Sequence, residues 1–482
     1  MPREVGASPS PARETGGLGR VVRGFGALAA SSLVSQLVGF AALVYVARRT
    51  GATNLGAYTF ALLLATYFNL FASLGIDYLA TRDLAQGRDS VGSIVGETLV
   101  LQGVLSLPLY FGLIALAPLL STNHEVERLI PIVGLILVTT TFTLDWALIA
   151  LKKSGSVALW RLIGQVVYAS LVPLLVIEGR SGIFHYAWLN ILGLGVTAMG
   201  LMWVFVRLTA IRPHVSTSRM LWLRLRRSLP FAYSLLMIQI YAGIGSLMLG
   251  YLYSTHAVGI YAVASKLPLA LIGFANLWLN VLFPHTAQRL LADARGFAHD
   301  LGRIMTATIV IAAAATVGAF LCAGTLMATL FGASFQAAAV PFALLSGAAA
   351  LVLVQANFSN VLLAGGTQRY YAVVMTIATA VVVLLNLVLI PPLGTRGAAI
   401  STVCGEIGLT ALTLMGVRRR LGPIPLEARR LLRGAAAVGL MAVAMVGARS
   451  VGGAIVQIAV ALPTFVAAAW AFSVFDRDLI RR

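Results

Sequence analysis

The sequence contains little charge and very few acidic residues. Only 11% of its 482 residues are charged and 16 are Asp or Glu, whereas 59% are hydrophobic and the mean hydropathy is +0.91. Globular domains are typically about a quarter charged, and a soluble chain of this length needs polar residues to cover several domains. The composition therefore excludes a soluble enzyme and predicts a polytopic membrane protein.

Motifs for catalysis and metal binding are also missing. The two cysteines, Cys322 and Cys404, lie in separate apolar runs and offer neither a disulfide framework nor a metal site. The sequence has no Walker-type glycine-rich loop, no GxSxG and no HExxH, and its six histidines are scattered. We therefore expect no enzyme activity, no catalytic residue, no metal and no cofactor.

Long apolar runs fill most of the chain. A membrane-spanning helix needs about 20 apolar residues, and such windows predict an all-α protein with about 14 transmembrane helices. They lie near residues 24–47, 56–79, 93–118, 129–151, 157–177, 183–206, 230–253, 258–284, 304–330, 338–363, 370–390, 396–417, 433–450 and 453–475. Residues 1–22 precede them and are predicted to be a disordered cytoplasmic tail.

The net charge of +19 indicates membrane topology and not nucleic-acid binding. Most Lys and Arg residues fall in the even-numbered loops and the two termini. The opposite side carries few, namely Arg48, Arg49, Arg128, Arg180, Arg396 and Arg449. Because basic loops stay cytoplasmic, we expect both termini to be cytoplasmic and the protein to be a multi-pass protein of the bacterial inner membrane.

An internal repeat recurs at an offset of 203 residues. Leu55–Tyr58 aligns with Val258–Tyr261, and Asp77 aligns with Asn280. The offset spans six helices, an even number, so the two copies have the same orientation. We expect an N-lobe (23–206) and a C-lobe (230–417) around a central cavity, joined by a basic linker (207–229). A second basic loop (418–432) and two further helices with a cytoplasmic C-terminus (433–482) follow.

Several ordered motifs resemble those of the Wzx-type oligosaccharide-lipid flippases of the multidrug/oligosaccharidyl-lipid/polysaccharide exporter superfamily. They are Ala47–Gly51 with Leu55–Ala61, Leu74–Asp77 with Thr81–Ala85, Val258–Lys266, Leu362–Gly366, Asn386–Pro391, and Gly394 with Gly397–Thr402 and Glu406. The resemblance implies a flippase that moves an undecaprenyl-pyrophosphate-linked oligosaccharide to the outer leaflet for exopolysaccharide or O-antigen synthesis. It also suggests membrane lipids, H+ or Na+, a polysaccharide polymerase and glycosyltransferases as partners.

A flippase of this kind needs a polar path, because charged and hydroxylated groups are costly in hydrocarbon. Polar residues recur on one face of two predicted helices that are repeat mates, with further polar residues on helices 1 and 7. We expect the cavity to contain Asn69, Ser73, Asn276, Asn280, Gln36 and Gln239. The alternative interpretation is that such residues join helices by hydrogen bonds and close packing.

Five basic residues are candidates for binding pyrophosphate. Lys266 lies within a predicted span, where a charged group is usually functional. Arg48 and Arg49 lie at the outer mouth, and Arg82 and Lys152 lie at cytoplasmic helix ends. The alternatives are that Lys266 extends to the interface or pairs with a carboxylate, and that the others bind lipid head groups.

Four acidic residues in or near the spans are candidates for ion coupling. Asp77, Glu97 and Asp145 lie toward the cytoplasmic ends of helices 2, 3 and 4, and Glu406 lies near the middle of helix 12. Asp77 and Glu406 are the leading candidates. The alternative is a neutralising partner for each acid, such as Lys152 for Asp145.

Other functions remain open on the sequence. A lipid II flippase or a multidrug exporter of the same superfamily would have the same helices, although a drug exporter is expected to prefer an acidic cavity over one with a lysine. A membrane glycosyltransferase or polymerase fits less well, because such an enzyme needs a large extracytoplasmic loop and the outer loops are short.

Overall fold

The computed structural model describes residues 15–87, 90–121, 123–209, 214, 217–450 and 452–474, with the side chains of 15–32, 208–209, 218, 274–288, 290–292 and 294–295 left out. All regular structure in this part of the chain is helical. Thirteen stretches in it are long and apolar enough to cross a membrane. One of them, Leu33–Ser73, has 41 residues and breaks at Gly51 (φ 78°), so it supplies two crossings. The all-α, multi-pass fold is confirmed.

The first bundle, which we call the N-lobe, consists of the helices up to α8. They are α1 (Thr15–Ser73), α2 (Ile76–Ala85), α3 (Val91–Leu120), α4 (His124–Val133), α5 (Ile136–Thr141), α6 (Asp145–Ala150), α7 (Ser154–Leu175) and α8 (Arg180–Thr209). Side-chain caps begin some of them: Ser90 accepts a hydrogen bond from the Ser93 backbone N–H, and Asn123 accepts one from the Glu125 backbone N–H.

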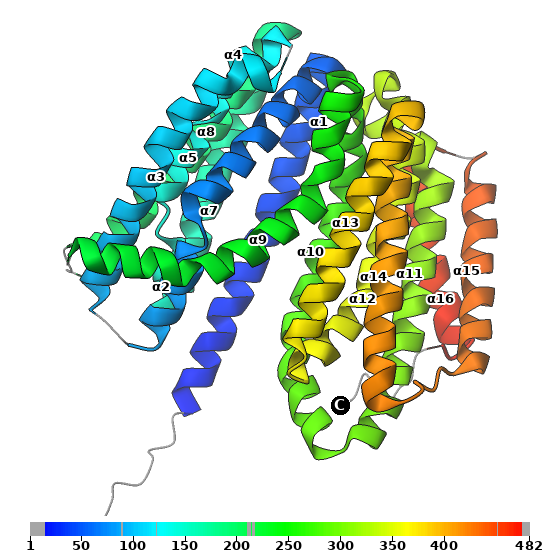
Figure 1. Ribbon diagram of the computed structural model, residues 1–482. Helices are drawn as coiled ribbons and strands as arrows, with labels where there is room; N and C mark the ends of the chain where they lie inside the picture. The colour runs from blue at the N-terminus through cyan, green and yellow to red at the C-terminus, as the bar shows by residue number, and fades with distance from the viewer. Residues whose placement is uncertain are drawn as a thin grey trace, which may run out of the picture.

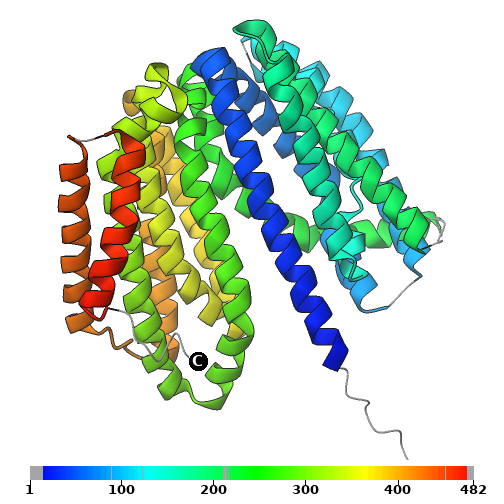
Figure 2. The same cartoon turned by 180° about the vertical axis from the view of Figure 1, so that it is seen from behind.

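The second bundle, which we call the C-lobe, comes next in the chain. It consists of α9 (Ser218–Leu252), α10 (Thr255–Ala292), α11 (Ala294–Phe331), η1 (Ala333–Ala338), α12 (Ala339–Ala364), α13 (Gln368–Leu393) and α14 (Thr395–Leu421). The last two helices, α15 (Ala428–Ala448) and α16 (Ala454–Ala471), pair with each other and pack on α11 at the outside of the C-lobe (Figure 2).

The two lobes lie close together at one end of the molecule and diverge toward the other (Figure 1). We call the end that carries Gly51 and the α9–α10 turn the closed end, and the end that carries α2 and the α10–α11 turn the open end. The first turns of α9 lie across the open end of the N-lobe, and its later turns join the C-lobe beside α13.

Equivalent residues of the repeat form the contact at the closed end. A Cβ at Gly56 would lie 1.8 Å from the Thr255 carbonyl oxygen, and one at Gly259 would lie 1.9 Å from the Ala52 carbonyl oxygen. Gly56 and Gly259 are repeat mates, as are Ala52 and Thr255, so each lobe makes the same contact on the other. Close backbone packing of this kind requires glycine at both positions.

Three predicted helices differ from those in the structure. The predicted helix 129–151 is three short helices, interrupted near Gly134 and Phe142. Threonine hydroxyls compete for the backbone here, since Thr143 Oγ1 donates to the Thr140 carbonyl oxygen at 2.6 Å. The predicted helix 230–253 begins at Ser218, inside the predicted linker, and α1 begins at Thr15, inside the predicted tail.

Candidate functional site: a polar pocket in the N-lobe

The N-lobe contains a polar pocket with a volume of about 480 Å³. Four helical segments form its walls: α1, the α5–α6 region, α7 and α8. Its lining consists mainly of amides, hydroxyls and glycines, namely Ser35, Gln36, Thr140, Thr143, Asp145, Arg161, Gly164, Gln165, Tyr168, Asn190, Gly193, Leu194, Thr197 and Leu201. Such a lining offers hydrogen-bond donors and acceptors without a large net charge.

Helical periodicity directs two rows of side chains into this pocket. On α7 the lining positions are 161, 164, 165 and 168, and on α8 they are 190, 193, 194, 197 and 201. Steps of three and four residues keep each row on one face of its helix. Gln165, Tyr168 and Asn190 were not among the predicted site residues, although the same spacing rule identifies them.

The polar groups of the lining include one hydroxyl without a partner and one ion pair among the described residues. Ser35 Oγ is buried and has no hydrogen-bond partner among the described residues. The one charged pair of the lining joins Asp145 to Arg161, so Asp145 has a neutralising partner, which is Arg161 and not Lys152. Because the ion pair neutralises itself, the pocket suits a neutral ligand rich in hydroxyls better than an isolated anion or cation.

Two predicted site residues line the pocket, and a third contacts its wall. Gln36 and Asp145 are lining residues. Asn69 is behind the wall, where its Oδ1 accepts a hydrogen bond of 2.8 Å from Thr140 Oγ1. Ser73 donates to the Leu70 carbonyl oxygen of its own helix at 3.2 Å. Gln36 and Asp145 therefore remain the predicted residues with direct access to a ligand.

Lys266 lies across the lobe boundary from the pocket. Its side chain is exposed, and no carboxylate among the described residues pairs with it. Gly273 lies two helical turns further along the same face of α10, and a Cβ there would lie 3.8 Å from Gln36 Oε1. The face of α10 that carries Lys266 thus approaches the pocket at its lining residue Gln36.

Three other predicted cavity residues lie on α9 and α10. The Gln239 carbonyl oxygen accepts a hydrogen bond from the Tyr67 hydroxyl at 3.2 Å, so α9 contacts α1 at this level. Asn276 and Asn280 lie on α10, outside the residues whose side chains are described.

Arg48 and Arg49 bind protein groups at the closed end. Arg48 Nε donates to the Leu330 carbonyl oxygen at 2.7 Å, and its Nη2 donates to the Thr329 carbonyl oxygen. Arg49 pairs with Glu178 at 2.5 Å. Arg48 therefore joins α1 to the end of α11 in the other lobe, and phosphate binding by these arginines stays a prediction.

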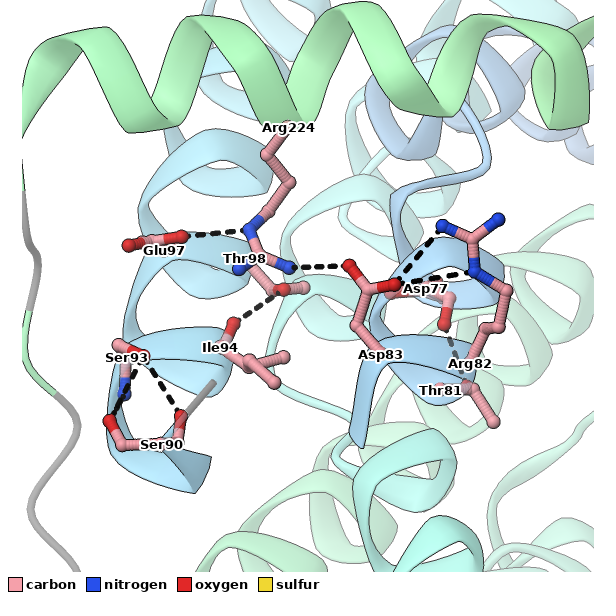
Figure 3. A network of polar contacts seen from close by, with 10 residues as sticks. All are labelled: Asp77, Thr81, Arg82, Asp83, Ser90, Ser93, Ile94, Glu97, Thr98 and Arg224. Carbon is pink, nitrogen blue, oxygen red and sulfur yellow. Dashed lines mark hydrogen bonds and ion pairs between the residues drawn. The ribbon is translucent and has the colours of Figure 1, made fainter. Parts of the chain in front are cut away.

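Three further predicted residues, Asp77, Arg82 and Glu97, lie near one another beneath the first turns of α9 (Figure 3). Glu97 is buried and accepts a hydrogen bond of 2.8 Å from Arg224 Nε. Arg82 pairs with Asp83 at 3.1 Å. The Asp77 carboxylate, which is half-buried, accepts a hydrogen bond of 2.6 Å from Gln102 Nε2. Lys152, which follows α6, is exposed.

The C-lobe contains a smaller buried polar cluster around Glu406. Tyr241 donates to Glu406 Oε1 at 2.8 Å, and Glu406 Oε2 is buried with no hydrogen-bond partner among the described residues. The Asn386 side-chain nitrogen and oxygen are also buried and have no hydrogen-bond partner among the described residues. One turn before Glu406, the Thr402 hydroxyl lies 3.3 Å from the Tyr261 hydroxyl. We call Tyr241, Tyr261, Asn386, Thr402 and Glu406 the C-lobe cluster.

Three solved structures of known transporters share this fold. A structure described as lipid II flippase MurJ in an inward closed conformation is 14% identical, with a TM-score of 0.76, and the match covers 94% of this chain and 99% of that one. An inward-facing multidrug resistance MATE family transporter of the MOP superfamily is 16% identical, with a TM-score of 0.65 over 80% of this chain and 94% of that one. An outward-facing transporter of that family is 15% identical, with a TM-score of 0.52 over 83% and 95%.

The sequence itself matches one family model. No curated protein matches the chain. The model described as polysaccharide biosynthesis protein matches residues 21–290, which is more than half of the chain and includes all four walls of the N-lobe pocket. The resemblance inferred from the motifs is therefore confirmed at the level of the family. The chain is a multi-pass membrane protein that belongs to the polysaccharide biosynthesis protein family.

Proposed function

We propose that the chain is a flippase for a lipid-linked oligosaccharide, with undecaprenyl pyrophosphate as the lipid link, in the inner membrane of a bacterium. The observation that carries the proposal is the N-lobe pocket, whose amides and hydroxyls suit a sugar. Family membership supports the class of cargo. The product would serve the synthesis of an exopolysaccharide or an O-antigen.

A pocket of this kind lowers the free-energy cost of moving a sugar head group across the hydrocarbon of the membrane. Each sugar hydroxyl that enters hydrocarbon without a hydrogen-bond partner costs several kcal/mol, roughly 2–7 by transfer measurements. Gln165 and Asn190 supply donors and acceptors that replace water. The apolar chain of the cargo needs no such shelter and can stay in the lipid, so the protein has only to carry the head group. No chemical step is involved.

The structure corresponds to an inward-facing state in this proposal. Basic residues follow or end helices at the open end, such as Lys152, Lys153 and the run Arg418–Arg420, which supports a cytoplasmic location for that end. The TM-scores to the inward closed flippase (0.76) and the inward-facing transporter (0.65) exceed the score to the outward-facing transporter (0.52), which supports an inward assignment. Closing the open end and separating Gly56 from Thr255 at the closed end would expose the pocket to the other leaflet.

Lys266 supplies the cationic group for the pyrophosphate in this proposal. Its ammonium has no carboxylate partner among the described residues, and its helix face leads to Gln36 at the pocket. The seven helical steps from Lys266 to Gly273 span about 10 Å. A head group with its sugar in the pocket would then place the phosphates toward α10.

The C-lobe cluster is the best candidate for coupling to H+ or Na+. Glu406 has a buried carboxylate oxygen with no hydrogen-bond partner among the described residues, and the buried Asn386 amide offers a further ligand oxygen. Glu97 and Asp145 are less suitable, because each already pairs with an arginine. Coupling through Glu406 would place the ion in one lobe and the sugar in the other.

The test is depletion of the protein in its native host, followed by mass spectrometry of lipid-linked sugars from intact cells and from spheroplasts. We expect a lipid-linked oligosaccharide to accumulate where externally added glycan-modifying enzymes cannot reach it, with lipid II unchanged. Re-expression of the intact chain is the control. Accumulation of lipid II instead would reassign the cargo to the peptidoglycan precursor, and accumulation of neither would reject the proposal.

A further inference from the structure

The first half of α9 is attached to the N-lobe, although the chain order and the repeat assign α9 to the C-lobe. The attachment begins before the helix, where the His214 backbone N–H donates to the Gly92 carbonyl oxygen of α3 at 3.1 Å. Thr217 then precedes α9, which runs across the open end of the N-lobe (Figure 1).

Arg224 is the centre of the attachment (Figure 3). Its Nε donates to Glu97 Oε2 of α3 at 2.8 Å, and its Nη1 lies 3.7 Å from Asp83 Oδ2 of α2. The three side chains are 7% exposed or less. One arginine thus connects α9 to two N-lobe helices, and Ser228, one turn later, is fully buried on the same face.

The neighbouring arginines of α9 do not share this arrangement. Arg226 and Arg227 are exposed and form no ion pair among the described residues, and Trp222 is 65% exposed. The helix therefore has one face fixed to protein and one face free. Arg224 lies on the fixed face, so the buried contact reflects its position on the helix and not the general basicity of the segment.

A steric contact continues the attachment one turn further. Gly75 has φ 69°, and a Cβ there would lie 2.7 Å from Phe231 Cβ and 2.9 Å from the Ala232 nitrogen. The Arg82 guanidinium lies over the Phe231 ring at 5.6 Å from its centre. Backbone contact and a cation–π contact thus follow the ion pair along the same face of α9.

We propose that Arg224 is a positioning residue that keeps the first half of α9 attached to the N-lobe throughout the transport cycle. Removing one partner of a buried ion pair leaves an unpaired charge and is strongly unfavourable, so the contact resists separation as the lobes move. The α9 segment from 218 to about 231 then moves with the N-lobe, and the lobes change their relative position beyond Phe231. The inference rests on the proposed two-lobe movement, but not on the identity of the cargo.

A distance measurement tests the attachment without any cargo. Spin labels are placed on cysteines that replace Trp222 of α9 and Tyr78 of α2, both exposed, after Cys322 and Cys404 are changed to alanine. We expect one narrow distance distribution in lipid nanodiscs, with or without an ion gradient. Arg224→Ala is expected to broaden it at least about twofold, Glu97→Gln to broaden it less, and Arg226→Ala to leave it unchanged. A distribution that is broad in the parent protein, or insensitive to Arg224→Ala, overturns the proposal.

A cross-link tests whether the contact must open during transport. Arg224→Cys with Glu97→Cys removes the ion pair, and a short bis-methanethiosulfonate restores the connection covalently. We expect the double variant to lose at least about fivefold in transport rate and the bridged protein to recover most of it. Bridging that abolishes transport, or that gives no recovery, would contradict a permanent attachment. If the parent protein moves no lipid-linked sugar, the proposed cargo is wrong, whereas the distance measurement still decides the role of Arg224.

Discussion

The two lobes present equivalent residues where they meet and different residues where they could bind. At the closed end, Gly56 and Gly259 are repeat mates and make the same backbone contact in both directions. Within the lobes, the N-lobe has a wide pocket lined by amides, whereas the C-lobe has a small buried cluster around Glu406. The repeat has therefore kept its closed-end contact and diverged in its binding chemistry, which favours a division of tasks between sugar and ion.

The largest effect is expected at the shared contact. Gly56→Val and Gly259→Val each place side-chain atoms on a backbone carbonyl of the other lobe. We expect both to abolish transport and to lower the free energy of unfolding by about 2–3 kcal/mol through overpacking. Thermal unfolding in detergent and vesicle transport are the measurements.

The control for this prediction is Gly408→Val, because no atom lies within 4 Å of a Cβ at that helix position. Equal losses in the two variants would establish that the contact is used symmetrically. A large loss of transport in one variant and none in the other would show that the two lobes do not use the contact equally.

Glu406→Gln tests the task assigned to the C-lobe. Glutamine keeps the shape and can still accept the Tyr241 hydrogen bond, but it has no charge for an ion to neutralise. We expect gradient-driven transport to fall about tenfold, equivalent to about 1.4 kcal/mol, while binding of the cargo is retained. Vesicles with and without a pH or Na+ gradient provide the measurement.

Asp300→Asn is the matched control for the carboxylate. Asp300 is an exposed C-lobe residue whose pair with Arg289 is at the surface, where such pairs are worth under about 1 kcal/mol. Transport by Glu406→Gln that still follows the gradient would remove the C-lobe cluster from the coupling step.

Gln165→Ala and Asn190→Ala test the task assigned to the N-lobe. Each removes about one hydrogen bond to a sugar, worth about 1 kcal/mol, so we expect KM for the lipid-linked sugar to rise about fivefold with a smaller change in kcat. Ser170→Ala is the control, because Ser170 is exposed on α7 and is not part of the lining. Unchanged kinetics in both pocket variants would contradict binding of the cargo in the pocket.

The smallest effect is expected at Lys266, which is exposed and not enclosed by the pocket. Lys266→Met should lower the transport rate about threefold, and Lys266→Arg should restore most of it, since a screened charge contact contributes under about 1 kcal/mol. Salt dependence of transport in the parent protein, absent in Lys266→Met, is the sharper measurement. Identical salt dependence in the two proteins would contradict phosphate binding by this residue.

Most of the fold follows from sequence patterns, and the exceptions have local causes. Apolar length predicts the spans, and the offset between Gly56 and Gly259 predicts two parallel lobes. The start of α9 could not be predicted in this way, because residues 218–229 are too basic for a hydropathy window. These residues form a helix that lies along the N-lobe, where Arg224 is neutralised by Glu97.

The site was only partly predictable, because spacing on one helix does not reveal which helices share a wall. Gln36 was found from its polarity within helix 1, but Gln165 and Asn190 become a pocket only when α7 and α8 pack face to face. Glu97 was selected as an ion-coupling candidate because it is an acid in a predicted span. The structure pairs it with Arg224, which lies 127 residues later in the chain. An ion pair between such distant positions leaves no periodic signal.

The reciprocal contact of Gly56 with Thr255 and of Gly259 with Ala52 has a consequence for the origin of the molecule. Position i of one half touches position j of the other, and j touches i, which is the rule for an isologous interface about a two-fold axis. A six-helix ancestor paired with a second copy of itself would make this same contact, in which the same glycine of each copy packs on the same carbonyl of the other. Gene fusion of such a homodimer, followed by separate drift of its halves, would leave the seam unchanged while the interiors became unlike.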